Sequence, residues 1–287
     1  MRYFLVMNPA SRGGRSKGYF ELIHKLLDGV DYDYEYTENL DHAANLSRRA
    51  NDGGYDVVVA VGGDGTINRV LNGFYDHNGK VSQAKLGVIY TGTSPDFCKN
   101  YGIPLQTNQA VDVLKKGAVK RIGIGRAEFK SCVRYFACCL NVGLGASTAT
   151  NANSGIRKKF GDKLGTFLSL FKTLMTYKPI DIVVNGEKLT NVYNLTVGKT
   201  YYLASGLKVK NNLREDDDRF YLFLMQNFKL SVLYKMYMGM DIDISYAERI
   251  EIEGEGLVDF DGDAATSFST LPCRISAAEK LQIITVE

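Results

Sequence analysis

The run Gly62-Gly63-Asp64-Gly65-Thr66 is the part of this sequence whose residue types point most clearly to chemistry. It stands between an apolar strand candidate, Val57 to Val61, and a helical stretch that begins at Ile67. Glycines in a sharp bend between a buried strand and a helix bring backbone N–H groups together, which suits a phosphate. The carboxylate of Asp64 would repel phosphate oxygens unless a divalent cation or a substrate hydroxyl lies between them, which favours phosphoryl transfer. The alternative is a glycine-rich turn in which Asp64 caps the helix.

A second candidate loop runs from Asn8 to Lys17 and carries glycines, hydroxyl groups and cations. The side chains of Arg12, Arg15 and Lys17 could neutralise phosphate charge. The loop lacks the Gly-x-x-x-x-Gly-Lys-Ser/Thr spacing of a P-loop. A solvated basic loop is therefore an equally good interpretation of this segment.

Acidic residues form two further candidates. Asp261 and Asp263 flank Gly262, and a kinase needs a carboxylate within hydrogen-bond reach of the hydroxyl that it phosphorylates. Asp-Gly-Asp is also a common surface turn. The run from Glu215 to Asp218 carries the ligand type that hard cations need, although such runs are usually solvated turns.

The first part of the chain, to about Lys120, alternates short apolar runs with helical periodicity, which predicts a parallel sheet covered by helices. Ligands bind such sheets at the carboxyl ends of the strands, and small and polar residues collect at those ends here. The predicted strands are Tyr3 to Met7, Tyr32 to Tyr36, Val57 to Val61 and Leu86 to Ile89, and the predicted helices are Tyr19 to Leu27, Asp41 to Ala50 and Ile67 to Tyr75.

After Lys120 the pattern changes to short strands separated by Gly, Asn and Asp, which predicts a mostly antiparallel second domain. Asn185-Gly186 predicts a two-residue hairpin turn. One helix is predicted from Lys163 to Tyr177. The predicted organisation is a nucleotide-binding α/β domain over residues 1–120, to which the tail of about 278–287 returns, and a β-rich substrate domain over residues 121–277.

The composition is that of a globular protein of 287 residues, with 45% hydrophobic and 23% charged residues. A net charge of +3 gives no argument for nucleic-acid binding. The spacing of the five cysteines matches neither a disulfide framework nor a Cys-x-x-Cys metal motif. The three histidines are far apart in the sequence, which argues against a zinc site or a Ser-His-Asp triad. No segment has the roughly 20 apolar residues of a membrane span, so we predict a cytoplasmic protein.

The order of these motifs resembles the diacylglycerol kinase catalytic-domain family of lipid kinases. The resemblance rests on motifs spread over essentially the whole chain, namely Asn8-Pro9-Ala10-Ser11, Gly62 to Thr66 with Asn68, Gly92 to Phe97, Gly102-Ile103-Pro104, Asn141 to Ala146, Lys178-Pro179-Ile180 and Asp261-Gly262-Asp263. It implies an N-terminal nucleotide-binding α/β domain, a C-terminal β-sandwich-like domain and a cleft between them, in which ATP meets a lipid alcohol.

The resemblance also implies roles for individual residues. Asp263 would be the catalytic base with support from Asp261, and Asp64 would organise Mg²⁺ and the phosphates. A structural Mg²⁺ would be held by Asp217 and by backbone carbonyls around Arg214 and Arg219. The residues implied to contact ATP are Asn8, Ser11, Thr37, Gly62, Gly63, Asp64, Gly65, Thr66, Asn68 and Thr93.

Several residues depart from the family pattern. Asp263 stands where Glu is usual and is shorter by roughly 1 Å, a displacement that can lower a rate about a hundredfold. Arg69 replaces a usual Glu and inverts a charge close to the predicted phosphates, and Pro95 replaces a hydrogen-bonding Asn. Lys199 stands where Asn is expected, and Asp218 replaces the Gly of an Asp-Asp-Gly turn.

The leading hypothesis is an ATP- and Mg²⁺-dependent lipid kinase that phosphorylates a hydroxyl of diacylglycerol or a similar lipid, in phospholipid biosynthesis. The departures motivate an alternative, a nucleotide-binding protein with weak or lost kinase activity that acts as a sensor or partner-binding module. A third hypothesis is an NAD kinase-like enzyme, since a Gly-Gly-Asp-Gly-Thr run occurs in that family too.

A lipid kinase must also reach its substrate. The stretch Phe228 to Met240 is rich in aromatic residues and Met, with Lys229 and Lys235 beside them, and could lie on a membrane interface or pack inside the protein. We therefore carry forward peripheral contact with the inner face of the membrane as an expectation. The sequence leaves open whether the chain forms a homodimer.

Overall fold

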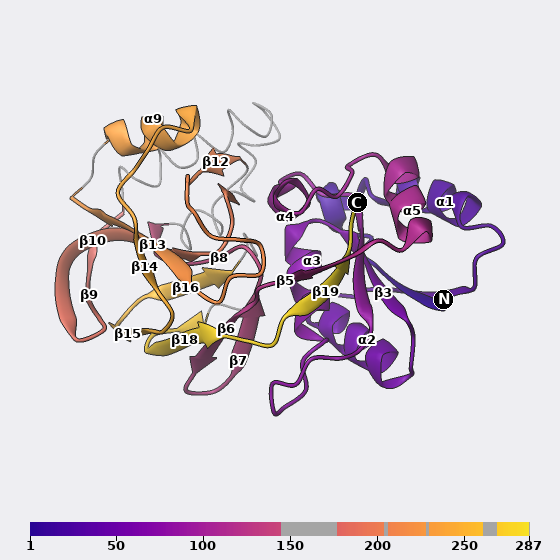
Figure 1. Ribbon diagram of the computed structural model, residues 1–287, viewed down its shortest axis with the longest axis horizontal. Helices are drawn as coiled ribbons and strands as arrows, with labels where there is room; N and C mark the ends of the chain where they lie inside the picture. The colour runs from indigo at the N-terminus through magenta and orange to yellow at the C-terminus, as the bar shows by residue number, and fades with distance from the viewer. Residues whose placement is uncertain (145–176, 204–205, 228–229, 261–268, 287) are drawn as a thin grey trace. The chain divides into compact units, whose positions relative to one another are not determined.

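The computed structural model describes residues 1–144, 177–203, 206–227, 230–260 and 269–286. They form two compact units, the first made of Met1–Gly123 and Glu279–Glu287 and the second of Ile124–Ala278 (Figure 1). The last residues of the chain therefore belong to the same unit as the first.

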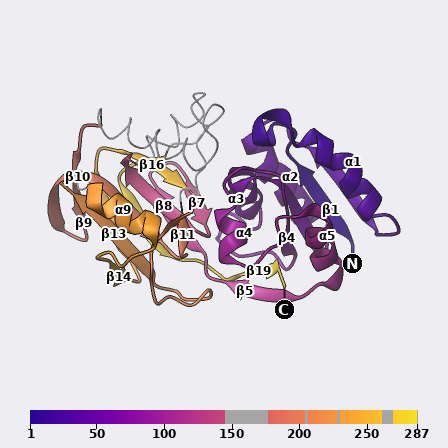
Figure 2. The ribbon, with the colours of Figure 1, turned by 90° about the horizontal axis from the view of Figure 1, so that it is seen from above.

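The first unit is built on a six-stranded sheet in the order β2-β1-β3-β4-β19-β5. Figure 1 labels β3, β5 and β19 of this sheet, and Figure 2 labels β1 and β4 as well. The first five strands in this order run parallel, and β5 is antiparallel to β19. The strands are β1 (Tyr3–Met7), β2 (Tyr32–Tyr36), β3 (Val57–Gly62), β4 (Lys85–Tyr90), β5 (Val119–Ile122) and β19 (Leu281–Ile284). The helices are α1 (Lys17–Leu26), α2 (Leu40–Asp52), α3 (Asp64–Asn72), α4 (Asp96–Asn100) and α5 (Thr107–Lys116), with a short 3-10 helix, η1, over Ser11–Gly14.

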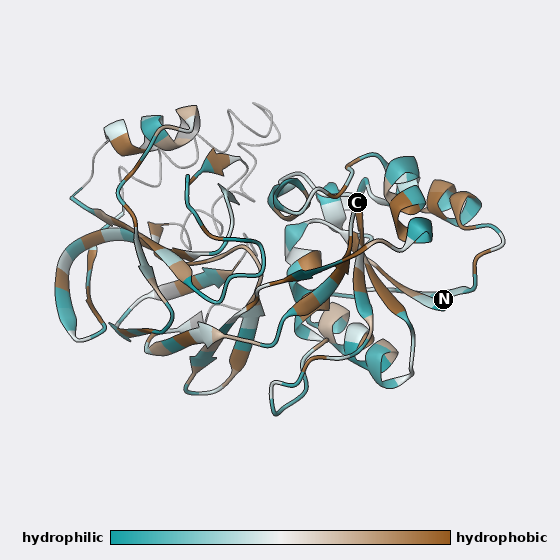
Figure 3. Cartoon of the chain, viewed as in Figure 1, coloured by the Kyte–Doolittle hydropathy of each residue, from teal (hydrophilic) through white to brown (hydrophobic). Residues whose placement is uncertain are grey.

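Helices on both faces explain why the central strands of this sheet are apolar throughout. All residues from Val57 to Val61 are fully buried. Alternate residues of β1 and β3 pack with Phe20 and Ile23 of α1 and with Leu114 of α5, while α2 and α3 pack together elsewhere in the unit. Figure 3 shows the resulting hydrophobic strands inside a more polar surface. A strand that faces helices on both sides has no solvent-facing positions, so its sequence is a continuous apolar run.

The helix after β3 begins earlier than its apolar pattern predicts. We expected it from Ile67, but α3 begins at Asp64, within the glycine run. Gly63 precedes it with an extended backbone and accepts the N–H of Ile67 at 3.0 Å. Gly63 rather than Asp64 therefore occupies the capping position, and Asp64 lies in the first helical turn, where a negative charge is favourable.

The second unit is dominated by an eleven-stranded sheet in which every pairing among the described residues is antiparallel. The strands of this sheet are β6 (Gly125–Phe129), β7 (Val133–Phe136), β8 (Cys139–Gly143), β9 (Ile180–Val184), β10 (Glu187–Gly198), β13 (Phe220–Gln226), β14 (Ser245–Ala247), β15 (Ile250–Gly254), β16 (Leu257–Phe260), β17 (Ser269–Thr270) and β18 (Cys273–Ala277). A two-stranded sheet, β11 (Tyr202–Leu203) with β12 (Leu207–Lys208), and helix α9 (Leu230–Met238) accompany it.

The predicted hairpin at Asn185-Gly186 is confirmed. Both residues have positive φ, 50° and 83°, and they join β9 to β10. These are the dihedral angles of the turn that matches strand twist in a two-residue hairpin. The predicted fold class, a parallel α/β domain followed by a mostly antiparallel β domain, is confirmed as well.

Candidate functional site

The carboxyl ends of β3 and β4 are in direct backbone contact. A Cβ atom added to Gly92, just after β4, would lie 2.4 Å from the Cα of Gly63 and 2.7 Å from the hydroxyl of Tyr90. A Cβ atom on Gly62 would lie 2.4 Å from the Cβ of Thr66. Such distances leave no room for a side chain, so packing alone requires glycine at these positions. The same packing presents the first N–H groups of α3 at the end of the strand, where helix N–H groups lack intrahelical acceptors.

The loop after β1 is fastened to the same place by buried side chains. Asn8 donates from Nδ2 to Oγ1 of Thr66 at 2.8 Å and accepts the N–H of Ala10 at 2.9 Å. Ser11 donates to the carbonyl of Thr91 at 3.2 Å. The ends of β1, β3 and β4 therefore form one continuous edge in the first unit.

The carboxylate of Asp64 joins two parts of this edge. Its Oδ2 accepts the N–H of Asp96, at the start of α4, at 3.0 Å, and its Oδ1 is buried. Burial, followed by the charge of Asp64, raises the pKa of the Tyr90 hydroxyl far above its ordinary value, and the same two causes raise the pKa of the buried Cys98 thiol. The negative charge of Asp64 thus acts on interior groups of the fold.

The residues predicted to contact ATP differ in their exposure. The side chains of Asn8, Ser11, Thr37, Thr66 and Asn68 are buried, and Gly62 is buried too. Gly63, Asp64 and Gly65 are partly exposed, and Thr93 is exposed. Thr37 donates its N–H to the carbonyl of Met7, beside the loop after β1. Of the accessible residues in this set, Gly63 and Gly65 offer only backbone groups, whereas Asp64 and Thr93 also carry polar side chains.

Arg69 is buried and forms an ion pair at 2.8 Å with Asp41 of α2. Asp41 is itself 64% exposed. The positive charge that replaces a usual Glu is thus paired across the contact between α2 and α3.

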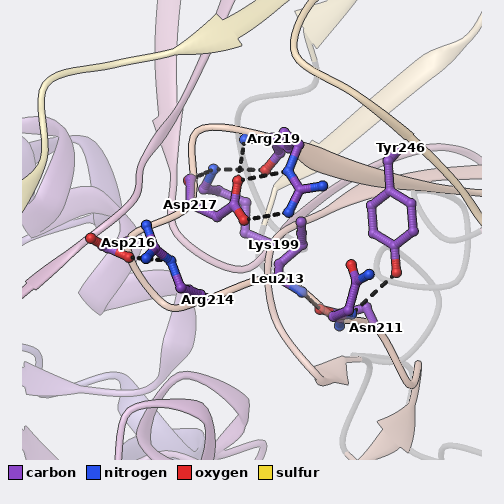
Figure 4. A network of polar contacts seen from close by, with 9 residues as sticks. Lys199, Asn211, Leu213, Arg214, Asp216, Asp217, Arg219 and Tyr246 are labelled. Carbon is purple, nitrogen blue, oxygen red and sulfur yellow. Dashed lines mark hydrogen bonds and ion pairs between the residues drawn. The ribbon is translucent and has the colours of Figure 1, made fainter.

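The predicted Mg²⁺ ligands lie in one turn of the second unit, and Figure 4 shows their contacts. The carboxylate of Asp217 accepts hydrogen bonds from Nε, Nη2 and the backbone N–H of Arg219, at 3.1, 2.8 and 2.9 Å. The carbonyl of Arg214 accepts the N–H of Asp217 at 3.0 Å. Arg219, as the first cause, lowers the pKa of the Asp217 carboxyl far below its ordinary value.

A residue that the sequence did not assign to this turn is central to it. Lys199 donates from Nζ to the carbonyls of Asp217 at 2.8 Å and of Arg219 at 3.2 Å. The only signal in the sequence was that Lys stands where Asn is expected. Within the described residues, no group of three or more His, Cys, Asp or Glu side chains is arranged to hold a metal ion.

Three other predictions fall wholly or partly outside the described residues, and one of them is the helix predicted from Lys163 to Tyr177. Asp261 and Asp263 lie outside the described residues, directly after β16, so their roles stay predictions. In the Met- and aromatic-rich stretch, Phe228 and Lys229 also lie outside, and α9 buries Met236 while it exposes Tyr234 and Met238. Among the helices described, none is long and apolar enough to cross a membrane.

Comparisons with known proteins agree with the motif series. A family model described as the diacylglycerol kinase catalytic domain matches residues 2–127. A diacylglycerol kinase of Staphylococcus aureus strain MRSA252 is 30% identical over 243 residues, which cover 80% of this chain and 72% of that protein. A diacylglycerol kinase of Staphylococcus saprophyticus is 30% identical over 207 residues, 69% of this chain and 63% of that protein, so the match spans less than two thirds of its length.

The fold has a close counterpart among solved structures. A putative diacylglycerol kinase from Bacillus anthracis strain Sterne aligns with a TM-score of 0.76 at 22% identity, over 99% of this chain and 97% of that one. The predicted resemblance to a family of lipid kinases is therefore confirmed.

Proposed function

The chain belongs to the diacylglycerol kinase catalytic-domain family, and we propose that it transfers the γ-phosphoryl group of ATP to a hydroxyl of diacylglycerol or a similar lipid. The family makes the chain a kinase, an enzyme of the transferase class. The nucleotide, the metal ion and the lipid are the parts of the proposal that go beyond family membership.

The observation that carries the proposal is the edge formed by the ends of β1, β3 and β4. Gly63 and Gly92 bring two backbone segments into contact, and Asn8 fixes Thr66 in the first turn of α3. The partly exposed backbone at Gly63 and Gly65 offers N–H groups at a helix N-terminus, where phosphate is favoured. In this proposal the triphosphate lies along the edge, and Mg²⁺ arrives with the nucleotide and neutralises part of its charge.

The transfer step needs a base for the lipid hydroxyl. The hydroxyl oxygen forms a bond to the γ-phosphorus, the bond from that phosphorus to the β–γ bridging oxygen breaks to release ADP, and the hydroxyl proton passes to a carboxylate. We assign that carboxylate to Asp263, with Asp261 in support, on the strength of the motif alone.

The direct test incubates the purified full chain with γ-labelled ATP, Mg²⁺ and vesicles that contain diacylglycerol. The proposal expects labelled lipid, a loss of about a hundredfold or more in Asp263→Asn, and a higher rate in Asp263→Glu. The exposed Asp112 of α5, changed to Asn, serves as a matched control whose rate should stay unchanged. Absence of labelled lipid from vesicles of several lipid alcohols would contradict the proposal.

One observation favours the alternative of a nucleotide-binding protein with weak or lost transfer activity. The carboxylate of Asp64 accepts the Asp96 N–H through Oδ2, and its Oδ1 is buried. This side chain therefore already holds the start of α4 in place. Nucleotide binding measured by thermal shift, without product from lipid or from NAD, would support that alternative. Labelled NADP would instead support the NAD kinase-like hypothesis.

We also propose peripheral membrane contact through α9 and the residues after it. Tyr234, Met238 and Met240 are 60%, 54% and 47% exposed, and Lys235 lies among them. Exposed aromatic and Met side chains beside a cation suit the interface of an anionic membrane. Co-sedimentation with anionic vesicles should fall several-fold in Tyr234→Ser/Met238→Ser, and unchanged co-sedimentation would contradict this contact.

A further inference from the structure

Lys199 is a buried cation that lies directly after β10. Its side chain and backbone together are only 7% exposed, and its N–H donates to the carbonyl of Cys138 at 2.9 Å. The ammonium lies 4.2 Å from the centre of the Phe220 ring, in addition to its bonds with the carbonyls of Asp217 and Arg219. An ammonium ion withdrawn from water is strongly destabilised unless such partners replace its hydration.

The two carbonyls come from a single turn and point at one cation. Both flank Asp218, so the turn folds around the end of the Lys199 side chain (Figure 4). Convergent backbone carbonyls are a usual way to hold a metal ion in a loop. Here a side chain of the same chain occupies the place of that ion.

The carboxylate of the turn is also satisfied from within the chain. Asp217 receives the guanidinium of Arg219 through two nitrogens, the paired geometry that an arginine fork and a carboxylate favour. Its side chain is 12% exposed, against 43% for Arg219, so the pair is partly shielded from solvent. Two cations of the protein therefore account for the carboxylate and for two of the carbonyls.

These contacts do not fit a divalent ion. Mg²⁺ requires a near-octahedral set of oxygens at about 2.0–2.1 Å. The carbonyl oxygens that would supply part of this set already surround an ammonium ion, and a second cation beside it would meet direct repulsion. The set of Asp217, Arg214 and Arg219 predicted from the resemblance is therefore a poor Mg²⁺ site in this chain.

We propose that the ammonium of Lys199 is a built-in replacement for a structural metal ion, and that the turn from Arg214 to Arg219 binds no divalent cation. The positive charge of Lys199 then explains why Lys stands where Asn is expected. A side chain that ends in a positive charge reaches the carbonyls that a neutral amide would leave to an ion. The turn is held at any Mg²⁺ concentration, and the metal requirement of the protein is confined to its nucleotide.

The first test measures metal binding by the nucleotide-free full chain. Free Mn²⁺ is titrated with the protein and followed by electron paramagnetic resonance, in the wild type and in Asp217→Asn. The proposal expects the same Mn²⁺ binding by both proteins. A Mn²⁺ ion that binds the wild type and is lost in Asp217→Asn would overturn it.

The second test removes the internal cation. Lys199→Met keeps most of the length of the side chain and removes its charge, which leaves two partly buried carbonyls without this donor. We expect its melting temperature to fall by about 5–10 °C, in EDTA and in Mg²⁺ alike. Lys210→Met is the matched control, because Lys210 is half exposed and pairs with the exposed Asp241 at 3.3 Å. Equal melting of the wild type and Lys199→Met would overturn the proposal.

Neither test involves phosphoryl transfer. Failure of the lipid kinase assay would leave both results interpretable, and a metal site found at Asp217 would leave the kinase proposal intact.

Discussion

The edge of the first unit and the Arg214–Arg219 turn of the second unit differ in how their polar and charged groups are paired within the chain. At the edge, close-packed glycines leave backbone N–H groups at a helix start, and the nearby polar side chains bond to one another. In the turn, carbonyl and carboxylate oxygens are taken up by Lys199 and Arg219. In the function proposed above the first region receives an external anion, whereas in the second region cations of the chain itself occupy these oxygens.

By the two proposals above, the first region keeps the ligand that its motif implies and the second does not. In both regions the motif residues lie at or between the ends of regular elements, and the resemblance assigned a ligand to each. The contacts within the chain distinguish the two regions, because a ligand site must keep some of its polar groups available to bind the ligand.

The largest effect is expected at Gly92. In Gly92→Ala the new Cβ atom would lie 2.4 Å from the Cα of Gly63, so the backbone of the edge must move. We expect a loss of about 1–3 kcal/mol in the free energy of unfolding and of most nucleotide binding. Denaturant unfolding and a fluorescent ATP analogue measure the two.

Gly18 offers the control for this change. It lies in α1 with open space around its Cα, so Gly18→Ala should stabilise the protein by a few tenths of a kcal/mol up to about 1 kcal/mol and leave nucleotide binding unchanged. If Gly92→Ala behaved like Gly18→Ala, the close packing of the edge would be without consequence.

A smaller effect is expected from Asp217→Asn. Loss of the charge-assisted bonds to Arg219 should lower the free energy of unfolding by about 2 kcal/mol at neutral pH. Arg219 holds the folded-state pKa of Asp217 below the unfolded value of about 3.9, so this stabilisation is complete above that value and is lost as the pH falls toward the folded-state pKa. The gap in melting temperature between wild type and variant should therefore narrow as the pH is lowered from 6 to 3.

Asp216 provides the comparison within the same turn. It pairs with Arg214 at 3.4 Å, and the two side chains are 41% and 78% exposed. Asp216→Asn should change the free energy of unfolding by less than about 1 kcal/mol at any pH. A gap for Asp217→Asn that stayed constant with pH would show that the ion pair with Arg219 does not stabilise the turn.

A smaller effect than that of Asp217→Asn is expected at the bond between Asn8 and Thr66. Asn8→Ala and Thr66→Val should each cost about 1–2 kcal/mol, and the double variant should lose less than the sum, since both remove one hydrogen bond. Thr66→Ser keeps the acceptor and should bind nucleotide as the wild type does. Additive losses in this double-mutant cycle would mean that the bond does not fasten the loop after β1 to α3.

Much of the fold could be predicted because local pattern and tertiary environment agree in the parallel sheet. The predicted strands at Tyr3 to Met7 and Tyr32 to Tyr36 have the bounds of β1 and β2. The start of α3 was misplaced, because Asp64, Gly65 and Thr66 carry no apolar periodicity and their helical shape depends on Gly63 as the cap. Helix α5 did not emerge from the sequence, although its buried residues Ala110, Val111 and Leu114 recur at helical spacing.

The same difference between local sequence pattern and tertiary contact applies to the two candidate regions. The edge could be expected from sequence, since glycines and the order of elements determine its backbone. The role of Lys199 could not, because its partners Asp217 and Arg219 follow it by 18 and 20 residues and meet it only when β10 and β13 pair. The bond from the Asp96 N–H to Asp64 likewise depends on the contact between the starts of α3 and α4, which are 32 residues apart.

The most direct test of the contrast is a two-step titration of the ¹⁵N-labelled chain followed by its backbone amide resonances. We predict that Mg²⁺ alone leaves the amides of Arg214 to Arg219 unchanged, and that ATP added next shifts those of Gly63, Gly65 and Thr66. Shifts of the Arg214–Arg219 amides with Mg²⁺ alone, or an unchanged Gly63–Thr66 turn at saturating ATP, would contradict the account.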